Sequence, residues 1–443
     1  MREDPVGPTL LRLTVPMIMG IISIMLINII DTLYIGQLGV AELAAISFTF
    51  PIVFSVMSVA FGIGIGTSAV VARAIGAGNR AQVQQLTTHS LLLTLVIMAG
   101  VSVIGLTTIE PIFTFLGADN ELLPIIDDYM IVWYCGVSLV AIPIVGNNAI
   151  RAAGDSKTPS LVMMVVAAVN AVLDPFLIFG IGPFPEMGVK GAAFATVFAY
   201  ACALCAGLWI LGAKEGMLST KFLKIRHVWG SWQRITYIAF PATITNILAP
   251  ISAALLTKII SLYGQDAVAG FGVGTRLEGL AIIGIMALST ILTPFIGQNF
   301  GAKDFFRIDK AISYSNKFAI VWGLSACILL ALSAKLVSPL FSASQAVQSV
   351  ITLFLWITPV SFAFYGLVIL AAAAYNGINR PMQSATISIV RLFILMIPLA
   401  WLGSRWWGLN GIFIGIAVAN IIGGLLAAWS IRRYISNYRD RLL

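Results

Sequence analysis

The chain has 443 residues, of which 59% are hydrophobic and only 10% are charged, and its mean hydropathy is +0.98. This composition excludes an ordinary soluble domain and indicates an integral membrane protein. The net charge of +8 would suggest a nucleic-acid partner for a soluble protein. In a membrane protein the distribution of charge between the two sides matters more than its sum, so we expect no nucleic-acid partner.

Apolar runs long enough to cross a bilayer follow one another along the whole chain, separated by short polar connectors. We therefore expect an all-α integral membrane protein. Its twelve predicted spans are about 10–35, 44–71, 86–108, 124–147, 160–181, 189–212, 236–262, 267–295, 311–334, 346–374, 384–403 and 409–433. The N-terminus shows no basic region followed by a short apolar core and a cleavage site, so we expect the first span to be retained.

Basic residues are distributed unevenly between the predicted connectors. A cytoplasmic N-terminus assigns 20 of the 26 Lys and Arg residues to the cytoplasmic side and four to the outer side. This bias predicts that both termini are cytoplasmic. Lys258 and Arg391 fall within spans. We expect Lys258 to extend to the outer surface, whereas Arg391 would either line a cavity or reach the inner headgroups. The outer connectors carry acids, among them Glu278, which we expect to be solvated.

The two halves of the chain resemble each other. The residue types of Pro16, Gly39, Ala44 and Gly76 recur 225 residues later, in Pro241, Gly264, Ala269 and Gly301. We therefore expect two six-helix lobes, residues 1–212 and residues 236–443 with a cytoplasmic tail, joined by a cytoplasmic linker at 213–235. Because each half holds an even number of spans, the lobes should be related by a pseudo-two-fold axis along the membrane normal. Such a pair of lobes suits alternating access.

The fifth predicted span contains an amide and a carboxylate, Asn170 and Asp174, within an apolar run. Their spacing places both side chains on one helix face. Pro175 cannot donate a hydrogen bond to the carbonyl of Ala171, which leaves that acceptor free beside the carboxylate. An acid in the hydrocarbon region is costly and is by default a candidate for ion handling. Polar contact between helices is the alternative reading.

Asp31 lies in a comparable apolar setting near the outer end of the first span, with Tyr34 at helical spacing. It could instead be a helix-end carboxylate in contact with headgroups. Two carboxylates that approach each other in a partly buried cavity would, through desolvation and mutual repulsion, take up and release a proton near neutral pH. Thr196 in the sixth span is a weaker signal, because such threonines usually bond to their own helix.

The C-terminal half has no matching acids, since Asp31 aligns with Leu256 and Asp174 with Met396. The ion chemistry should therefore be confined to the N-terminal half. The sequence has no HExxH, GxSxG or Walker motif, and its two histidines and four cysteines lack the spacing of a metal site. We therefore predict that the chain is not an enzyme, that it has no cofactor, and that an ion gradient drives transport.

Several motifs together resemble the multidrug and toxic compound extrusion (MATE) transporters, in particular the DinF-like branch. These motifs are ARAIGAGNR, AIRAAGDSKTP, NAVLDP, GVKGAAFAT and GQNFGAKD. The resemblance implies an N-lobe cation site made of Asp31, Asn170, Asp174 and Thr196, in which the first three could ligate Na⁺. It further implies supporting roles for Tyr129, Asn147 and Met163, beside Tyr34. The NorM-like branch is less similar, because it relies on acids in the C-terminal half.

The resemblance implies antiport: lipophilic, often cationic drugs leave as H⁺ or Na⁺ enters. It also implies a multi-pass protein of a bacterial or archaeal cytoplasmic membrane, in contact with the lipid bilayer, and we expect a monomer. The alternative within the same superfamily is a flippase for lipids or lipid-linked precursors, for which we would expect more spans and several cavity arginines. An intramembrane enzyme would need a nucleophile or metal set that the sequence does not offer.

Overall fold

The computed structural model describes residues 1–222 and 224–440, with side chains up to 437. Leu223, in the predicted linker, and residues 441–443, in the predicted tail, lie outside the described residues. The part that is described is helical and contains no strand. Its α-helices are α1 (Val6–Leu38), α2 (Val40–Gly76), α3 (Arg80–Phe115), α4 (Leu123–Ala153), α5 (Lys157–Phe179), α6 (Gly188–Trp209), α7 (Ile225–Ile260), α8 (Gln265–Ala281), α9 (Ile283–Gly301), α10 (Phe305–Phe341), α11 (Gln345–Ile357), α12 (Phe362–Gly377), α13 (Pro381–Ile389) and α14 (Ile397–Asp440).

Within the described residues, eleven helical segments are long and apolar enough to cross a membrane. The last of them, Pro381–Asn437, has 57 residues. At 1.5 Å per residue it would be about twice as long as a bilayer is thick. It is in fact two crossings, because non-helical backbone at Trp407 and Gly408 separates α14 into two parts. The prediction of an all-α fold with twelve crossings is thereby confirmed.

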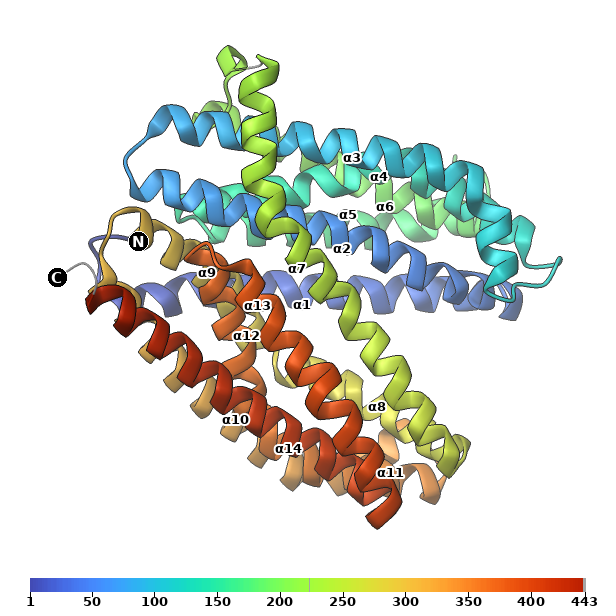
Figure 1. Ribbon diagram of the computed structural model, residues 1–443. Helices are drawn as coiled ribbons and strands as arrows, with labels where there is room; N and C mark the ends of the chain where they lie inside the picture. The colour runs from blue at the N-terminus through green and yellow to red at the C-terminus, as the bar shows by residue number, and fades with distance from the viewer. Residues whose placement is uncertain (223, 441–443) are drawn as a thin grey trace. The chain divides into compact units, whose positions relative to one another are not determined.

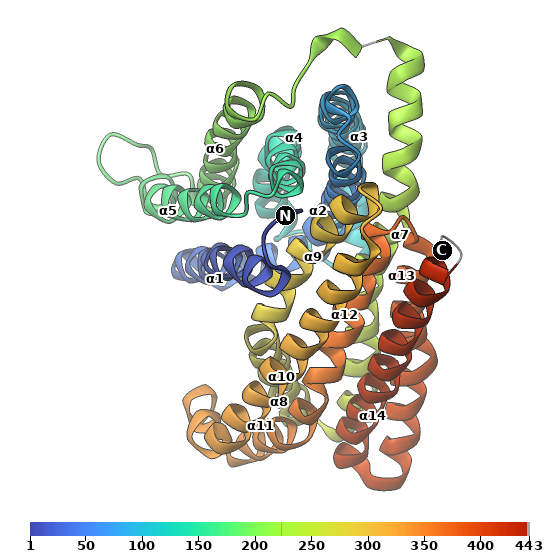
Figure 2. The ribbon, with the colours of Figure 1, turned by 90° about the vertical axis from the view of Figure 1, so that its left-hand side faces the viewer.

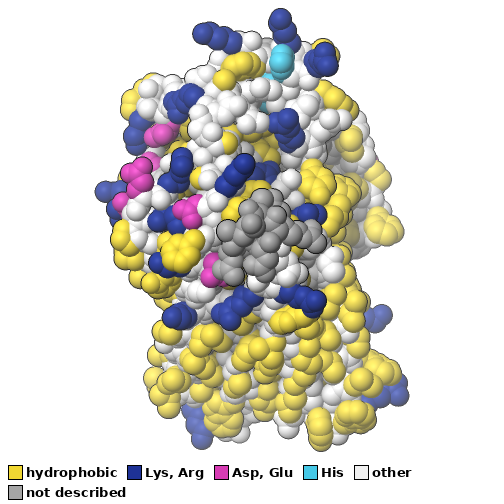
Figure 3. Space-filling view, turned by 60° about the vertical axis from the view of Figure 1, so that its left-hand side comes forward, with side chains coloured by type: hydrophobic (Ala, Val, Ile, Leu, Met, Phe, Trp, Pro, Cys, Tyr) yellow, Lys and Arg dark blue, Asp and Glu magenta, His cyan; other side chains and the backbone are white. Residues whose placement is uncertain are grey.

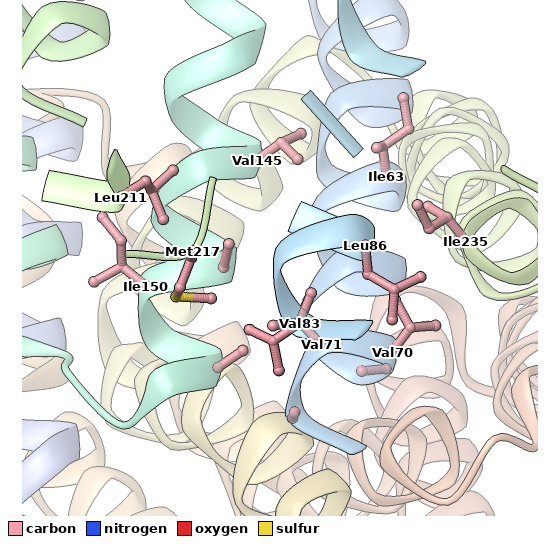
Figure 4. Close-up of a cluster of buried hydrophobic side chains, with 14 of the residues drawn as sticks. Ile63, Val70, Val71, Val83, Leu86, Val145, Ile150, Leu211, Met217 and Ile235 are labelled. Atoms are coloured by element: carbon pink, nitrogen blue, oxygen red, sulfur yellow. The ribbon is translucent and has the colours of Figure 1, made fainter. Parts of the chain in front are cut away.

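The chain forms two compact units, and the first is Pro16–Thr243. In this unit α4 packs against α2, α3 and α6, and α5 packs against α6 (Figures 1 and 2). An apolar cluster shown in Figure 4 joins α2, α3, α4 and the start of α7, with Val70, Val83, Val145 and Ile235 among its members. The packing of this cluster therefore holds α2, α3, α4 and the start of α7 together.

The second unit contains Met1–Val15 together with the residues from Ile244 onward. Here α12 packs against α9, α10 and α14. Arg307 fixes the N-terminal residues to this unit by donating hydrogen bonds to the backbone oxygens of Met1 (3.0 Å) and Asp4 (2.7 Å). The units thus divide the chain at 15/16 and 243/244, whereas we expected lobes at 1–212 and 236–443. Half of the expected linker is helical, because α7 begins at Ile225.

The internal repeat is visible in the turns. The turn before α3 has Gly78 at φ 72° and the cap Asn79, whose side chain accepts from the amide of Gln82. The turn before α10, 225 residues later, has Lys303 at φ 60° and the cap Asp304, which accepts from the amide of Arg307. The same local geometry therefore starts both helices.

A second matching pair of turns precedes α6 and the final part of α14. Gly188 and Gly408 both have positive φ, 53° and 59°. Three residues after each lies a glycine with no room for a side chain. A Cβ on Gly191 would lie 2.4 Å from the carbonyl oxygen of Leu177, and one on Gly411 would lie 1.9 Å from that of Gly403. At both places two helix backbones are in direct contact.

Candidate functional site

Asn170 and Asp174 lie one turn apart on α5, and both are buried, with exposed fractions of 2% and 0%. The amide of Asn170 donates from Nδ2 to Asp174 Oδ1 at 3.2 Å. Pro175 lies inside α5 without ending it. The sequence interpretation of two side chains on one helix face is therefore matched by the geometry.

Thr196 on α6 completes this group. Its hydroxyl oxygen accepts a hydrogen bond from Asn170 Nδ2 at 3.2 Å. The contact is possible because α5 and α6 approach at Gly191, where a side chain would collide with Leu177. Thr196, a weak signal from the residues alone that the family resemblance placed in the cation site, thus has a partner on a neighbouring helix.

Asp31 comes to the group from α1. It interacts electrostatically with Asp174, and both carboxylates act on Tyr129 of α4, which is 9% exposed. α1 and α5 are held close at Gly20, where an added Cβ would lie 3.2 Å from Met163 Sδ. Three helices therefore bring two acids, an amide and a phenol to one buried region.

Two carboxylate oxygens in this region have no hydrogen-bond partner among the described residues, Asp31 Oδ1 and Asp174 Oδ2. No basic side chain in the described part forms an ion pair with either acid. A buried carboxylate without a partner is unfavourable, and binding a cation would relieve that cost. The donor set of carboxylate, amide and hydroxyl oxygens suits a proton or a hard cation such as Na⁺. No group of three or more His, Cys, Asp or Glu that could hold a metal occurs in residues 1–222 and 224–440.

The remaining predicted residues differ in their contacts. Met163 packs against α1, as described, and Tyr34 makes an edge-to-face contact with Phe179 at the end of α5, with ring centroids 6.1 Å apart. Both therefore support the packing of α1 on α5. Asn147 is 9% exposed on α4, but its side chain makes no hydrogen bond with the other site residues that the structure describes. The structure gives it no direct role in this group.

The C-terminal half also contains charge that the sequence interpretation undervalued. We expected Glu278 in an outer connector, yet it lies within α8 and interacts electrostatically with Arg391. Arg391 is 8% exposed, donates to Asn420 Oδ1 at 2.8 Å, and lies over the ring of Tyr365 at 4.2 Å. Arg391 therefore belongs to a buried network and does not reach the headgroups. Lys258 is exposed in the last turn of α7.

Comparison with known proteins gives consistent matches over nearly the whole chain. A family model described as MatE matches residues 16–176 and 241–402. A protein of Shewanella oneidensis named "FAD transporter" is 39% identical over 97% of this chain and 95% of its own length. "Multidrug export protein MepA" of Staphylococcus haemolyticus is 25% identical over 99% of this chain and 95% of its own. The crystal structure of the Vibrio cholerae MATE transporter VcmN in the bent form is 30% identical. It superposes with a TM-score of 0.93 and covers 98% of this chain and 97% of VcmN.

Proposed function

Because the chain belongs to the multidrug and toxic compound extrusion (MATE) family of multi-pass membrane transporters, we propose that it is a secondary antiporter that exports small molecules in exchange for H⁺ or Na⁺. Asp31, Asn170, Asp174 and Thr196 would bind the coupling cation. We further propose a monomer in a bacterial or archaeal cytoplasmic membrane, with both termini in the cytoplasm.

One observation carries this proposal. Asp174 is fully buried, it accepts from Asn170 through one oxygen, and its other oxygen has no partner within the described residues. A helix framework alone does not need such an acid, because an unpaired buried carboxylate lowers stability. A cation that enters the site would gain the interaction that the carboxylate lacks. If the cation binds one conformation better than the other, binding shifts the protein toward that conformation, and an ion gradient can thereby drive export.

The substrate class has two candidates. Relatives named as multidrug proteins favour lipophilic or cationic drugs. The relative named "FAD transporter", at 39% identity, favours a large aromatic anion. A lipid flippase of the same superfamily is the third possibility. It would move lipid without a requirement for Asp31 or Asp174.

Reconstituted protein tests the proposal. Purified chain in liposomes is given a dye, a lipophilic drug or FAD, and the proton and sodium gradients are imposed separately. We expect that one of the two imposed ion gradients drives export of a probe. We expect Asp31→Asn and Asp174→Asn each to lose about 5- to 150-fold of gradient-driven export. This loss corresponds to a coupling free energy of about 1–3 kcal/mol. Asp266→Asn, an exposed acid in the C-terminal half, serves as the control.

Three results would contradict the proposal. The first is export at the wild-type rate by both variants under the same gradient, which would remove the acids from the coupling step. The second is that neither gradient drives export of any of the probes. Labelled lipid could cross the bilayer equally in wild type and variants, which would favour the flippase.

A further inference from the structure

A pocket opens where the first turns of α3 meet the first turns of α7, and both lie in the unit Pro16–Thr243. Its volume is about 540 Å³. This volume lies within the range of about 300–1,000 Å³ that is usual for small-molecule sites. The lining residues that matter here are Gln82, Gln85, Arg226, His227, Ser231 and Arg234. None of the proposed transport residues lines it.

Hydrogen bonds between α3 and α7 hold the pocket in shape. Gln85 Nε2 donates to Ser231 Oγ at 3.1 Å and to the backbone oxygen of His227 at 3.4 Å. Ser231 Oγ also lies 2.9 Å from His89 Nδ1, and Trp232 Nε1 donates to the backbone oxygen of His89 at 3.0 Å. Three of these four contacts are between buried or partly buried groups. The pocket is therefore preformed by hydrogen bonds between α3 and α7.

The apolar cluster below the pocket fixes the same two helices. Leu86 of α3 and Ile235 of α7 belong to it and lie close together in Figure 4. α7 also touches α2 at Gly66, where an added Cβ would lie 2.7 Å from the backbone oxygen of Ile235. Movement of α7 away from α3 would therefore expose apolar surface, which is costly.

The pocket is positively charged and has no acid in its lining. Arg226 and Arg234 form no ion pair with any carboxylate in the described part of the chain. The nearby Arg80 differs, because its guanidinium donates to the backbone oxygens of Glu215 and Gly216. Figure 3 shows Lys and Arg side chains gathered around a histidine at the upper end of the molecule in that view. Two guanidinium groups are thus left available for a ligand.

The other donors of the pocket favour the same charge. The N-terminal end of α3 contributes partial positive charge, since the first backbone N–H groups of a helix lack partners within it. Asn79 already satisfies the amide of Gln82. The Gln82 side chain makes no hydrogen bond with the residues described and can therefore donate. Guanidinium groups and amides together recognise a phosphate group best.

The outer face of α7 beside the pocket is apolar. Ile225 is 88% exposed and Trp229 is 60% exposed, and both lie within one turn of Arg226. Tryptophan concentrates at the boundary between membrane and water. We infer from these two side chains that the pocket opens near the depth of phospholipid headgroups.

We propose that the pocket formed by α3 and α7 binds a phosphate group through Arg226, Arg234 and the amide of Gln82. The phosphate would come from the headgroup of an anionic phospholipid or from a soluble phosphate compound. α7, like α1, is a helix in which the chain passes from one unit to the other, in this case at Thr243. A ligand in the pocket would bind the first turns of α7, which precede Thr243 in the chain. The inference is independent of the proposed cation site.

The test uses the full-length protein purified in detergent. Retention of phosphatidylglycerol is measured by native mass spectrometry, with phosphatidylcholine, whose phosphate is balanced by a choline cation, as the net-neutral comparison. Inorganic pyrophosphate is titrated by thermal shift at constant ionic strength. The variant Arg226→Gln/Arg234→Gln removes both guanidinium groups. Arg432→Gln/Arg433→Gln removes two exposed charges near the end of α14 and is the matched control.

A second variant guards against misfolding. Gln82→Glu keeps the shape of the side chain and puts a carboxylate into the pocket. An acid in the first turn of a helix is favourable, so α3 should stay folded. We expect each pocket variant to weaken binding by about tenfold or more, as the loss of a charge-assisted hydrogen bond does. The control should change binding by less than about twofold, as exposed charges usually do.

Each outcome decides the proposal. Phosphatidylglycerol retained by wild type and lost in both pocket variants supports a lipid phosphate. Stabilisation by pyrophosphate that both variants lose supports a soluble one. Equal loss in the control, unchanged binding in Gln82→Glu, or no binding of either probe to the wild type would overturn it.

Discussion

Four polar positions of the N-terminal half have apolar counterparts in the C-terminal half. The repeat pairs Asp31, Asn170, Asp174 and Thr196 with Leu256, Leu392, Met396 and Ile416. The four counterparts are 4–6% exposed and belong to one apolar cluster. The same helix framework thus encloses a polar group in one half and a hydrophobic core in the other.

This difference separates what the fold needs from what the function needs. The C-terminal cluster shows that helices of this kind pack well with Leu, Met and Ile at these positions. The acids of the N-terminal half therefore contribute no packing that an apolar residue could not supply, and they carry a desolvation cost. Exchanging residues between matched positions is the direct way to test this comparison.

The largest effect is expected when the acid is placed in the apolar half. Met396→Asp buries a carboxylate in the C-terminal cluster, where Met396 is 6% exposed. An uncompensated buried charge costs about 3–5 kcal/mol. The midpoint of thermal unfolding in detergent should fall strongly or the protein should fail to accumulate. Met396→Leu is the control and should cost less than about 1.5 kcal/mol. If Met396→Asp were as stable as Met396→Leu, the two halves would not differ as described.

The reverse exchange should separate stability from transport. Asp174→Met removes a buried acid that has an unpartnered oxygen. Replacing a buried charge by a well-packed apolar side chain is often stabilising, by about 1–4 kcal/mol, and Met, although larger than Asp, is flexible enough to fill irregular space. We expect a higher unfolding midpoint together with the loss of gradient-driven export. A variant that is both less stable and still coupled would show that Asp174 serves the packing of α5.

Thr196 should show a smaller effect. Thr196→Val keeps the shape of the side chain and removes the oxygen that accepts from Asn170. A hydrogen bond of this kind contributes about 0.5–1.5 kcal/mol, so the concentration of coupling cation for half-maximal export should rise by up to about tenfold. Thr257→Val is the matched control, because that hydroxyl bonds to Ala253 of its own helix. Equal shifts in both variants would remove Thr196 from the cation site.

The smallest effect concerns the connectors at 155 and 379. Asp155 precedes α5 and accepts from the backbone and hydroxyl of Thr158, with Lys214 Nζ 3.5 Å away. Burial raises the pKa of Asp155, but these hydrogen bonds and the Lys214 ammonium lower it by more, so the pKa lies below its ordinary value. Asn379, its counterpart, cannot titrate.

The sign of the pH effect follows from that lowered pKa. The stabilisation by Asp155 is present above the unfolded-state pKa of about 3.9 and is lost as the pH falls through the folded-state value. The unfolding midpoint of the wild type should therefore fall more steeply on acidification than that of Asp155→Asn. Asp128→Asn is the control, because Asp128 forms only an exposed pair with Lys190. Parallel curves for wild type and Asp155→Asn would contradict the prediction.

The sequence predicted what local spacing determines. The placement of Asn170 and Asp174 on one face follows from the helical period, and the division into two similar halves follows from the repeat. The family resemblance placed Thr196 and Asn170 in one site, but residue spacing alone could not predict their contact, because it depends on the approach of α5 and α6 at Gly191. Periodicity describes one helix and says little about which neighbour it touches.

Charge was the least dependable guide to local structure. The basic stretch before 236 was predicted to be a linker, and its residues from Ile225 onward are helical and form the start of α7. Val228, Ser231 and Ile235 are buried there at helical spacing, while the basic side chains of this stretch are exposed. Arg151 is only 8% exposed although it is charged and lies in the last turn of α4. A few apolar positions at the right spacing outweigh a high local charge.

The two glycine turns, at Gly188 with Gly191 and at Gly408 with Gly411, have a consequence for the history of the chain. A gene duplication would have produced two copies of one half, each with the acid or each without it. The residues of the proposed cation site now differ between the two halves, whereas both glycines have the same backbone geometry. A substitution at Gly191 or Gly411 meets the backbone of a neighbouring helix, so no second substitution in a side chain can compensate for it. The turn is the inherited part of each half, and the ion chemistry is the part that was free to change.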